Sequence, residues 1–204
     1  MINFVDIMKA GGEIYKIFIS PGFSTHPPCI VNKDYIPNNI IDAMSKGWLT
    51  SYHPPKDIIA FYIKDVFVTG EGLVITSDGD IIAQSVTQNG PQDIEVALSN
   101  IKNKSPIIVD EKTLLLRKRG DTNYGHWQIE VLPKLWLADG VIDFQNLLIP
   151  HGGPAMNRIY RDSISYSSKR KYNNIYAEKN NVYKLKELLI IDGMTKHGTY
   201  MSPL

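Results

Sequence analysis

The stretch LLLRKRGDTNYGHWQIEVLPKLWLADG, residues 114–140, decides how this chain is expected to fold. It contains most of a hydrophobic strand, TLLL at 113–116, then a polar loop, then a run with helical spacing over 124–138. A second hydrophobic strand, NLLIP, follows at 146–150. Because parallel strands need a long connection between them, this order predicts a parallel sheet with a crossover helix.

The same alternation continues toward the C-terminus. A helix is expected over 154–165, and strands are expected over 173–178 and 185–192. Right-handed crossovers would make residues 111–204 a Rossmann-like layered domain, with loops at the carboxyl ends of its strands available for a site. The predicted fold class is therefore α/β.

Residues 58–110 are expected to form a small antiparallel β-meander followed by a helix. Short apolar runs alternate with turn residues over 60–87. The pair Asp78-Gly79 in this region is a strong signal for a hairpin with a type I′ turn, which needs positive φ at both central residues. The helix is expected over 92–104.

Residues 1–57 are expected to form a loop-rich N-terminal extension. Prolines at 21, 27, 28, 37, 54 and 55 interrupt this part of the chain, and proline fixes φ and removes a backbone donor. One helix is expected within it, from Asn38 to Lys46, ended at Gly47.

Composition and charge exclude several classes of function. The chain has 204 residues, of which 43% are hydrophobic and 21% charged, as in an ordinary globular protein. Its 22 basic and 21 acidic residues give a net charge of +1, so nucleic acid is not an expected partner. Cys29 is the only cysteine, which excludes an internal disulfide and argues against cysteine-rich zinc sites.

Charged residues interrupt the apolar residues at the start of the sequence, so a signal peptide is not expected, and no uncharged apolar run is long enough to span a membrane. The expected location is the cytoplasm, and a peripheral association with a membrane stays open. The sequence does not give the oligomeric state.

His126 and Glu130 are the candidate chemical pair. Their i, i+4 spacing places both on one face of the expected helix, where a histidine and a carboxylate can exchange protons with a bound hydroxyl. The alternative is that the pair only stabilises the helix, as such pairs commonly do. Pro133 is expected either to kink this helix near Ile129 or to begin a second helix.

Cationic residues lie in the loop before this helix, and apolar residues form a stripe along a different face from that of His126 and Glu130. Arg117 and Arg119 lie in the loop, and Asp121, Thr122 or Asn123 is expected to cap the helix, whose N-terminal amides would favour an anion. A separate stripe of apolar side chains is expected to bury against the sheet. It consists of Trp127, Val131 and Leu135.

The run NYGHWQIEVLPKL, residues 123–135, resembles the signature of glycosyltransferase family 61. That signature has an aromatic residue near a His-Trp pair, then an acidic residue, then Leu-Pro-basic-Leu. The upstream segment VFVTGEGLVITSDGDIIAQS, residues 66–85, also resembles the family's capsular-polysaccharide biosynthesis members. The resemblance covers about Asp65 to Leu204.

This resemblance implies a transferase that moves a sugar from a nucleotide-sugar donor to a glycan acceptor in surface or capsular polysaccharide synthesis. It implies a two-domain GT-B architecture and an inverting mechanism, with residues 111–204 in the acceptor-side domain. Glu130 would be the base that deprotonates the acceptor hydroxyl, with His126 beside it. The substrate-binding residues would be Arg117, Arg119, Asn123, Tyr124, Trp127 and His151.

His151 begins the segment HGGP after the strand 146–150, a position where α/β loops commonly hold ligands. The alternative is a tight turn with an incidental histidine. The sequence contains no dinucleotide or ATP motif and requires neither a metal nor a cofactor, the nucleotide-sugar being a substrate.

The sequence departs from the family in one respect: the second domain, which holds much of the nucleotide-sugar site, is expected to be absent. Two rival functions stay open. One is a non-catalytic binding or assembly module that pairs with a separate nucleotide-binding chain, for which an exposed apolar patch over 188–204 would be evidence. The other is a self-contained hydrolase or transferase with His126 as base, for which the sequence offers no nucleophile motif.

Overall fold

The computed structural model describes residues 2–45, 49–196 and 200–204. By their contacts, the residues form two compact units, which are described separately. The first contains the chain through Lys16 together with Ala60–Ile191, and the second contains Ile17–Ile59 together with Asp192–Leu204. The expected helix end at Gly47 lies outside the described residues.

The molecule is mixed α/β, and ten of its strands form one mixed sheet. The predicted meander is confirmed as β5 (Lys56–Thr69), β6 (Leu73–Ile75) and β7 (Ile81–Ile82), whose neighbours pair antiparallel. The hairpin at Asp78-Gly79 is also confirmed, but its turn is not type I′. Only Gly79 has positive φ, and its N–H donates to Thr76 O.

The parallel part of the sheet follows the predicted order of elements. Its neighbouring parallel pairs join β8 (Ile107–Val109) to β12 (Val182–Asp192), then β12 to β9 (Thr113–Leu115), β9 to β10 (Asn146–Pro150) and β10 to β11 (Asn173–Ala177). Helical segments connect β9 to β10 and β10 to β11. The carboxyl ends of these three strands therefore meet at one edge of the sheet.

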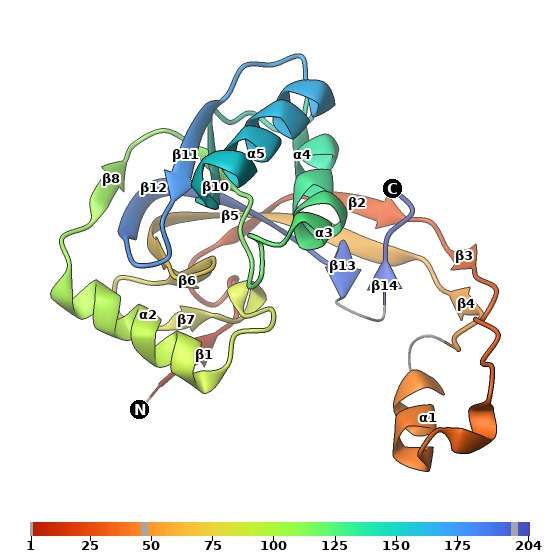
Figure 1. The fold of residues 1–204 in the computed structure, drawn as a ribbon. Helices are drawn as coiled ribbons and strands as arrows, with labels where there is room; N and C mark the ends of the chain where they lie inside the picture. Colours follow the sequence, from red (N-terminus) through yellow and green to blue (C-terminus); the bar gives the residue numbers. More distant parts are fainter. Residues whose placement is uncertain (1, 46–48, 197–199) are drawn as a thin grey trace. The chain divides into compact units, whose positions relative to one another are not determined.

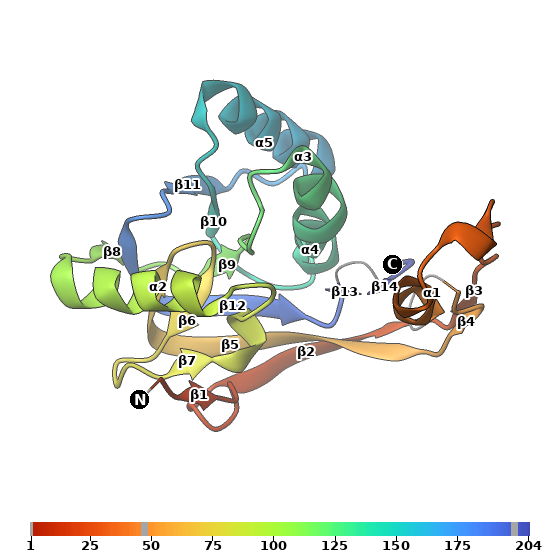
Figure 2. The ribbon, with the colours of Figure 1, turned by 60° about the horizontal axis from the view of Figure 1, so that its bottom comes forward.

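The helix between β9 and β10 is a continuous run of three parts. They are α3 (Tyr124–His126), a π turn η3 (Trp127–Val131) and α4 (Leu132–Ala138). Figure 1 shows this run beside α5 (Gly153–Ser167), which connects β10 to β11. Figure 2 shows the same two helices from a second angle.

The N-terminal residues correct the expectation of a loop-rich extension over 1–57. Strand β1 (Phe4–Val5) pairs parallel with β7, and β2 (Glu13–Ser20) pairs with β5. Because one sheet contains strands from 1–57, 58–110 and 111–204, the contacts do not divide the chain at those expected boundaries. Strand pairing between distant segments, rather than local composition, sets the divisions.

Helix α2 (Pro91–Asn103) completes the core beside the meander. Its Ile94 and Ala97 are buried against Leu73, Ile75 and Ile81. The short helix η2 (Ala83–Ser85) precedes it. Within the described part of the chain, no helix has both the length and the apolar character needed to cross a membrane.

The second unit consists of short elements. They are β3 (Phe23–Ser24), η1 (Lys33–Tyr35), α1 (Asn38–Ser45), β4 (Tyr52–His53), β13 (Thr195–Lys196) and β14 (Tyr200–Met201). Two antiparallel pairs form, β3 with β4 and β13 with β14. The rings of Phe23, His53 and Tyr200 pack together, with Phe23 and His53 stacked at a centroid distance of 4.7 Å.

Candidate active site

The π turn results from Pro133. Proline has no N–H, so Pro133 cannot donate to the carbonyl of Ile129, and its ring crowds that carbonyl. The turn before it widens, and the N–H of Leu132 donates to Trp127 O, five residues back. Both predicted outcomes for Pro133 are met in part, because the helix is distorted near Ile129 and α4 begins one residue before the proline. Glu130 lies within this turn.

The carboxylate of Glu130 is held between two cationic or ionisable side chains. Its Oε1 lies 2.6 Å from His126 Nδ1, and its Oε2 forms a buried ion pair with Lys118 Nζ. Glu130 is 7% exposed and Lys118 is 4% exposed, whereas the His126 side chain is 26% exposed. Burial removes water from the charged carboxylate, and this is tolerated because both of its oxygens have partners within the protein. His126 is therefore the solvent-accessible member of the group.

Gly120 lies against the imidazole of His126. Its φ of +76° is a left-handed conformation, and a Cβ placed on it would lie 3.2 Å from His126 Cδ2 and 3.6 Å from Nε2. Glycine thus permits the loop after β9 to pass close to the imidazole edge that faces away from Glu130.

Substituting Gly120 with alanine is expected to lower stability by about 1–3 kcal/mol and to displace His126. Gly140→Ala is the matched control, because Gly140 has a φ of +73° and no atom within 4 Å of the point that a Cβ would occupy. Both variants carry the backbone strain, and only Gly120→Ala adds contact with the ring. Urea unfolding and the His126 ring resonances in NMR measure the two effects. Identical behaviour of the two variants would show that the close approach has no consequence.

Arg117 joins three parts of the sheet edge. Its Nε lies 2.5 Å from Asp121 Oδ2, and its two terminal nitrogens donate to Ala177 O at 2.8 Å and Gly70 O at 3.2 Å. Those carbonyls belong to the end of β11 and to the residue after β5. Burial raises the pKa of the Asp121 carboxyl, and the adjacent Arg117 guanidinium opposes that rise. With its donors occupied inside the protein, Arg117 has a structural position and does not face a ligand.

Trp127 and Asn123 also differ from their expected roles as substrate contacts. The Trp127 side chain is fully buried, its Nε1 donates to Ser163 Oγ at 2.9 Å, and its ring packs on Tyr160. The predicted stripe of Trp127, Val131 and Leu135 is confirmed as core. The Asn123 side chain caps the helix by accepting from the N–H groups of Gly125 and His126. Those two amides are therefore not available to an anion.

The other three predicted binding residues are exposed. Arg119 forms an ion pair with Asp93 at 3.1 Å, Tyr124 lies at the start of α3, and His151 follows β10. The structure thus brings His126 and Glu130 together as predicted, and it directs the Arg119 guanidinium toward α2. Lys118 is the residue that the prediction omitted. Its partner Glu130 is twelve residues away, and no local spacing signals such a pair.

Asp93 supports both Arg119 and the start of α2. Its Oδ2 accepts the backbone N–H of Gly90 at 3.0 Å, and this hydrogen bond, together with the charges of Arg119 and Lys179, lowers the pKa of Asp93. A carboxyl with a lowered pKa in the folded state stabilises the fold above its unfolded pKa. That contribution is lost as the pH falls through the folded value.

Asp93→Ala is therefore expected to cost about 1 kcal/mol of stability at neutral pH, because the backbone N–H of Gly90 at the start of the helix loses its acceptor. The difference between wild type and variant should shrink as the pH falls below the ordinary aspartate value of 3.8. Urea unfolding over a pH series measures it. Asp110→Ala is the control, since the exposed pair of Asp110 with Lys186 contributes little. A difference independent of pH would contradict this assignment.

Among the described residues, no three His, Cys, Asp or Glu side chains are grouped closely enough to hold a metal ion. Comparisons of the chain with protein-family models, with curated proteins and with solved structures found no match. The case for a function therefore comes from the site itself and from the sequence resemblance.

Proposed function

We propose that this chain is the acceptor-side part of a glycosyltransferase of the family 61 type, which transfers a sugar from a nucleotide-sugar donor to a glycan hydroxyl. The observation that carries the proposal is the arrangement of His126, Glu130 and Lys118 at the carboxyl edge of β9. These residues include the two that the family-like run over 123–135 singles out. Surface or capsular polysaccharide synthesis is the corresponding process.

The connectivity around the site supports a Rossmann-like interpretation of this region. Three adjacent parallel strands, β9, β10 and β11, follow one another in sequence, and a helical segment lies between each pair. In such α/β layers, ligands bind outside the carboxyl ends of the strands. His126 and Glu130 follow β9 at that edge. In the proposed enzyme, this layer corresponds to the N-terminal half of a GT-B transferase, and nucleotide-sugar contacts come largely from a second domain.

The geometry favours His126 over Glu130 as the base. Both carboxylate oxygens of Glu130 are already engaged, Oε1 with His126 Nδ1 and Oε2 with Lys118 Nζ, and Glu130 is buried, whereas the His126 side chain is 26% exposed. A carboxylate bonded to Nδ1 fixes the orientation of an imidazole and stabilises the imidazolium that forms when the ring accepts a proton. Glu130 is then the positioning residue, and His126 Nε2 is the atom that receives the proton.

In the proposed reaction, His126 Nε2 takes the proton of the acceptor hydroxyl while the acceptor oxygen forms a bond to the anomeric carbon. The bond from that carbon to the phosphate oxygen breaks, and the nucleoside diphosphate leaves with the electron pair. Inversion at the anomeric carbon follows from a single displacement. Among Arg117, Lys118 and Arg119, only Arg119 has an exposed cation, and in the proposed enzyme it would exchange its ion pair with Asp93 for the donor phosphate.

The test is a transferase assay on the complete translated product of the native gene. Nucleotide-sugars with uridine, guanosine and cytidine bases are offered with a panel of glycan acceptors. Mass spectrometry then follows the acceptor's gain of one sugar, and a coupled assay follows release of the nucleotide. The expected result is a sugar-linked product from at least one donor. Absence of any product, with the chain folded, would rule out the proposal.

The alternative of an assembly module is not favoured by the feature that would have supported it. Leu188, Leu189, Ile190 and Ile191 are buried in β12. Of the described residues after them, the exposed large apolar side chains are Met201 and Leu204. These do not form the extended apolar patch that a pairing surface over 188–204 would need.

A further inference from the structure

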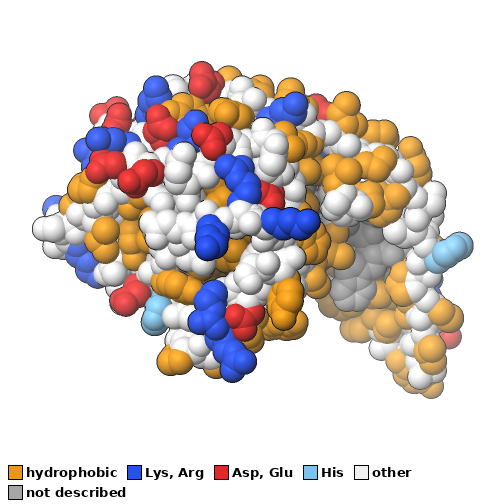
Figure 3. Space-filling view, turned by 90° about the horizontal axis from the view of Figure 1, so that it is seen from above, with side chains coloured by type: hydrophobic (Ala, Val, Ile, Leu, Met, Phe, Trp, Pro, Cys, Tyr) orange, Lys and Arg blue, Asp and Glu red, His pale blue; other side chains and the backbone are white. Residues whose placement is uncertain are grey.

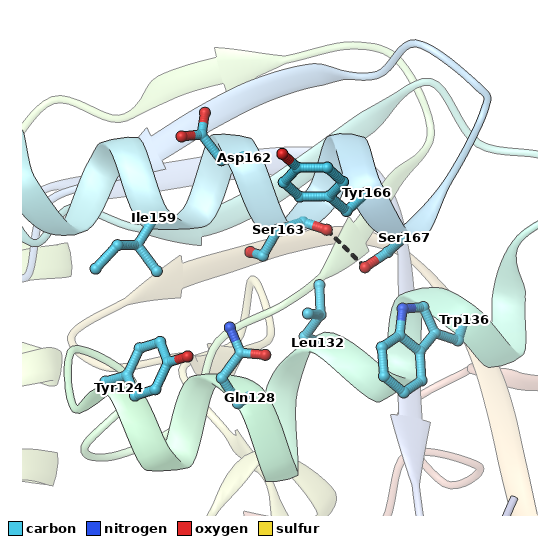
Figure 4. Close-up of a pocket in the computed structure, with 9 residues that line it drawn as sticks. All are labelled: Tyr124, Gln128, Leu132, Trp136, Ile159, Asp162, Ser163, Tyr166 and Ser167. Carbon is cyan, nitrogen blue, oxygen red and sulfur yellow. Dashed lines mark hydrogen bonds between the residues drawn. The ribbon is translucent and has the colours of Figure 1, made fainter.

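A groove of about 900 Å³ lies between α5 and the helical run of α3, η3 and α4. Figure 4 shows Tyr124, Gln128, Leu132 and Trp136 along one side, facing α5. These four residues recur at intervals of four, so they form a stripe along the helical run. The volume is within the range of sites for small ligands.

The groove lies on a different side of the helix from the His126–Glu130 pair. Each residue turns an α-helix by about 100°, so His126 is about 200° around from Tyr124. The π turn begins only after His126 and does not alter this separation. The groove is therefore a second site and not the place where the acceptor hydroxyl would meet His126.

Three exposed aromatic side chains border the groove. Tyr166 is 91% exposed, Tyr124 is 58% exposed and Trp136 is 53% exposed. Such rings offer a flat apolar face and a polar tip, which usually finds a hydrogen-bond partner when it is covered. Three of them around one groove make an apolar surface that a ligand with flat, partly apolar faces can cover.

The groove also contains polar side chains whose hydrogen-bonding groups are available to a ligand. No described residue hydrogen-bonds to the side chains of Tyr124, Gln128 or Tyr166. The Gln128 amide, which Figure 4 shows between Tyr124 and Leu132, can both donate and accept. A ligand that covers these polar atoms binds best if it carries hydroxyl or amide groups, which replace the water that the atoms lose.

Charge at the groove is balanced. Its one carboxylate, Asp162, forms ion pairs with Arg158 at 3.5 Å and Arg161 at 3.0 Å. Figure 3, the view from above, shows acidic and basic side chains interspersed on the surface that it draws. Only Leu132 and Ile159 supply aliphatic surface, which is little for the apolar face of a helix from another protein.

We propose that this groove binds a neutral saccharide chain. The rings of Trp136 and Tyr166 stack on the apolar faces of sugar rings, and Gln128 and Tyr124 hydrogen-bond to sugar hydroxyls. The inference does not rest on the transferase proposal, because the groove is on another side of the helix from His126. In a transferase, it would hold a part of the glycan away from the reacting end.

The experiment titrates the full 204-residue chain with maltohexaose, cellohexaose, chitohexaose and mannohexaose. NMR follows the indole N–H resonance of Trp136. The expected result is saturable binding of at least one saccharide with a dissociation constant of about 1 mM or below. Trp136→Ala and Tyr166→Ala should each weaken that binding about tenfold, measured by calorimetry. Tyr35→Ala is the matched control, because Tyr35 is 88% exposed and outside the groove.

Two outcomes would overturn the proposal. One is that none of the four saccharides binds, and the other is that Trp136→Ala and Tyr166→Ala bind as the wild type does. Circular dichroism establishes that the variants are folded. Failure of this site is distinguishable from failure of the proposed reaction, because saccharide binding is measured without a nucleotide-sugar donor and does not require sugar transfer.

Discussion

Arg117→Met is expected to lower the free energy of unfolding by about 3–5 kcal/mol, the usual cost of leaving one member of a buried ion pair without its partner. The substitution strands the carboxylate of Asp121, which is 0% exposed, and removes donors from the carbonyls of Gly70 and Ala177. Urea unfolding at neutral pH measures the loss. Arg119→Met is the control and should change stability by about 0.5 kcal/mol or less, since its ion pair is exposed.

The loss from Arg117→Met should also depend on pH. Burial raises the pKa of Asp121, and removal of the guanidinium takes away the charge that opposes this rise. A carboxyl whose folded pKa is above its unfolded value binds more protons in the folded state, so stability falls as the pH rises through that interval. The variant should therefore be closest to wild type in acid. A loss below about 1 kcal/mol at every pH would show that the pair does not hold the sheet edge together.

His126→Ala is expected to lower the rate of sugar transfer by about 10²–10⁴, the usual contribution of a general base. Glu130→Gln should retain more activity than His126→Ala, because the imidazole that accepts the proton is still present but is less well oriented. Initial rates over a range of acceptor concentrations measure both. The loss in His126→Ala should appear in kcat, since proton transfer occurs in the transition state.

The order of these two variants separates the two assignments of the base. With both variants shown by circular dichroism to be folded, a greater loss of activity in Glu130→Gln than in His126→Ala would make Glu130 the proton acceptor, as the sequence resemblance implies. The pH dependence gives a second readout. If His126 is the base, the His126→Ala variant should lose the limb of the pH–rate profile that the base produces in the wild type. His26→Ala, which replaces an exposed histidine of the other compact unit, is the control and should leave the rate unchanged.

The sequence predicts the local elements well where periodic patterns are strong. Helix α2 is predicted over 92–104 and is Pro91–Asn103, and α5 is predicted over 154–165 and is Gly153–Ser167. The contact between His126 and Glu130 is also predictable, because residues four apart in a helix lie about one turn apart. Information that lies within one turn or one strand is therefore readable from the chain.

Interactions between distant segments are not predictable in the same way. The sequence patterns miss strands β1 and β2, whose partners, β7 and β5, are far along the chain. Strand β1 has only two residues and little local signal, whereas β2, EIYKIFIS, is rich in β-branched and aromatic residues that could have indicated a strand. The burial of Arg117 depends on carbonyls at Gly70 and Ala177, which lie 47 and 60 residues away. A cationic side chain in a loop predicts a ligand contact, whereas in the structure Arg117 is buried and hydrogen-bonds to the backbone of two other segments.

The π turn fixes the angle, about the axis of the helical run, between the side chains of α3 and those of α4. It holds one residue more than an α-helical turn, so the residues before it and those after it are offset by about 100° from the positions that an unbroken helix would give them. Removing a single residue from Trp127–Val131 would leave the composition of the run almost unchanged and rotate Asn123, Tyr124 and His126 together. The position of the histidine is thus encoded by the number of residues in the run as much as by their identity.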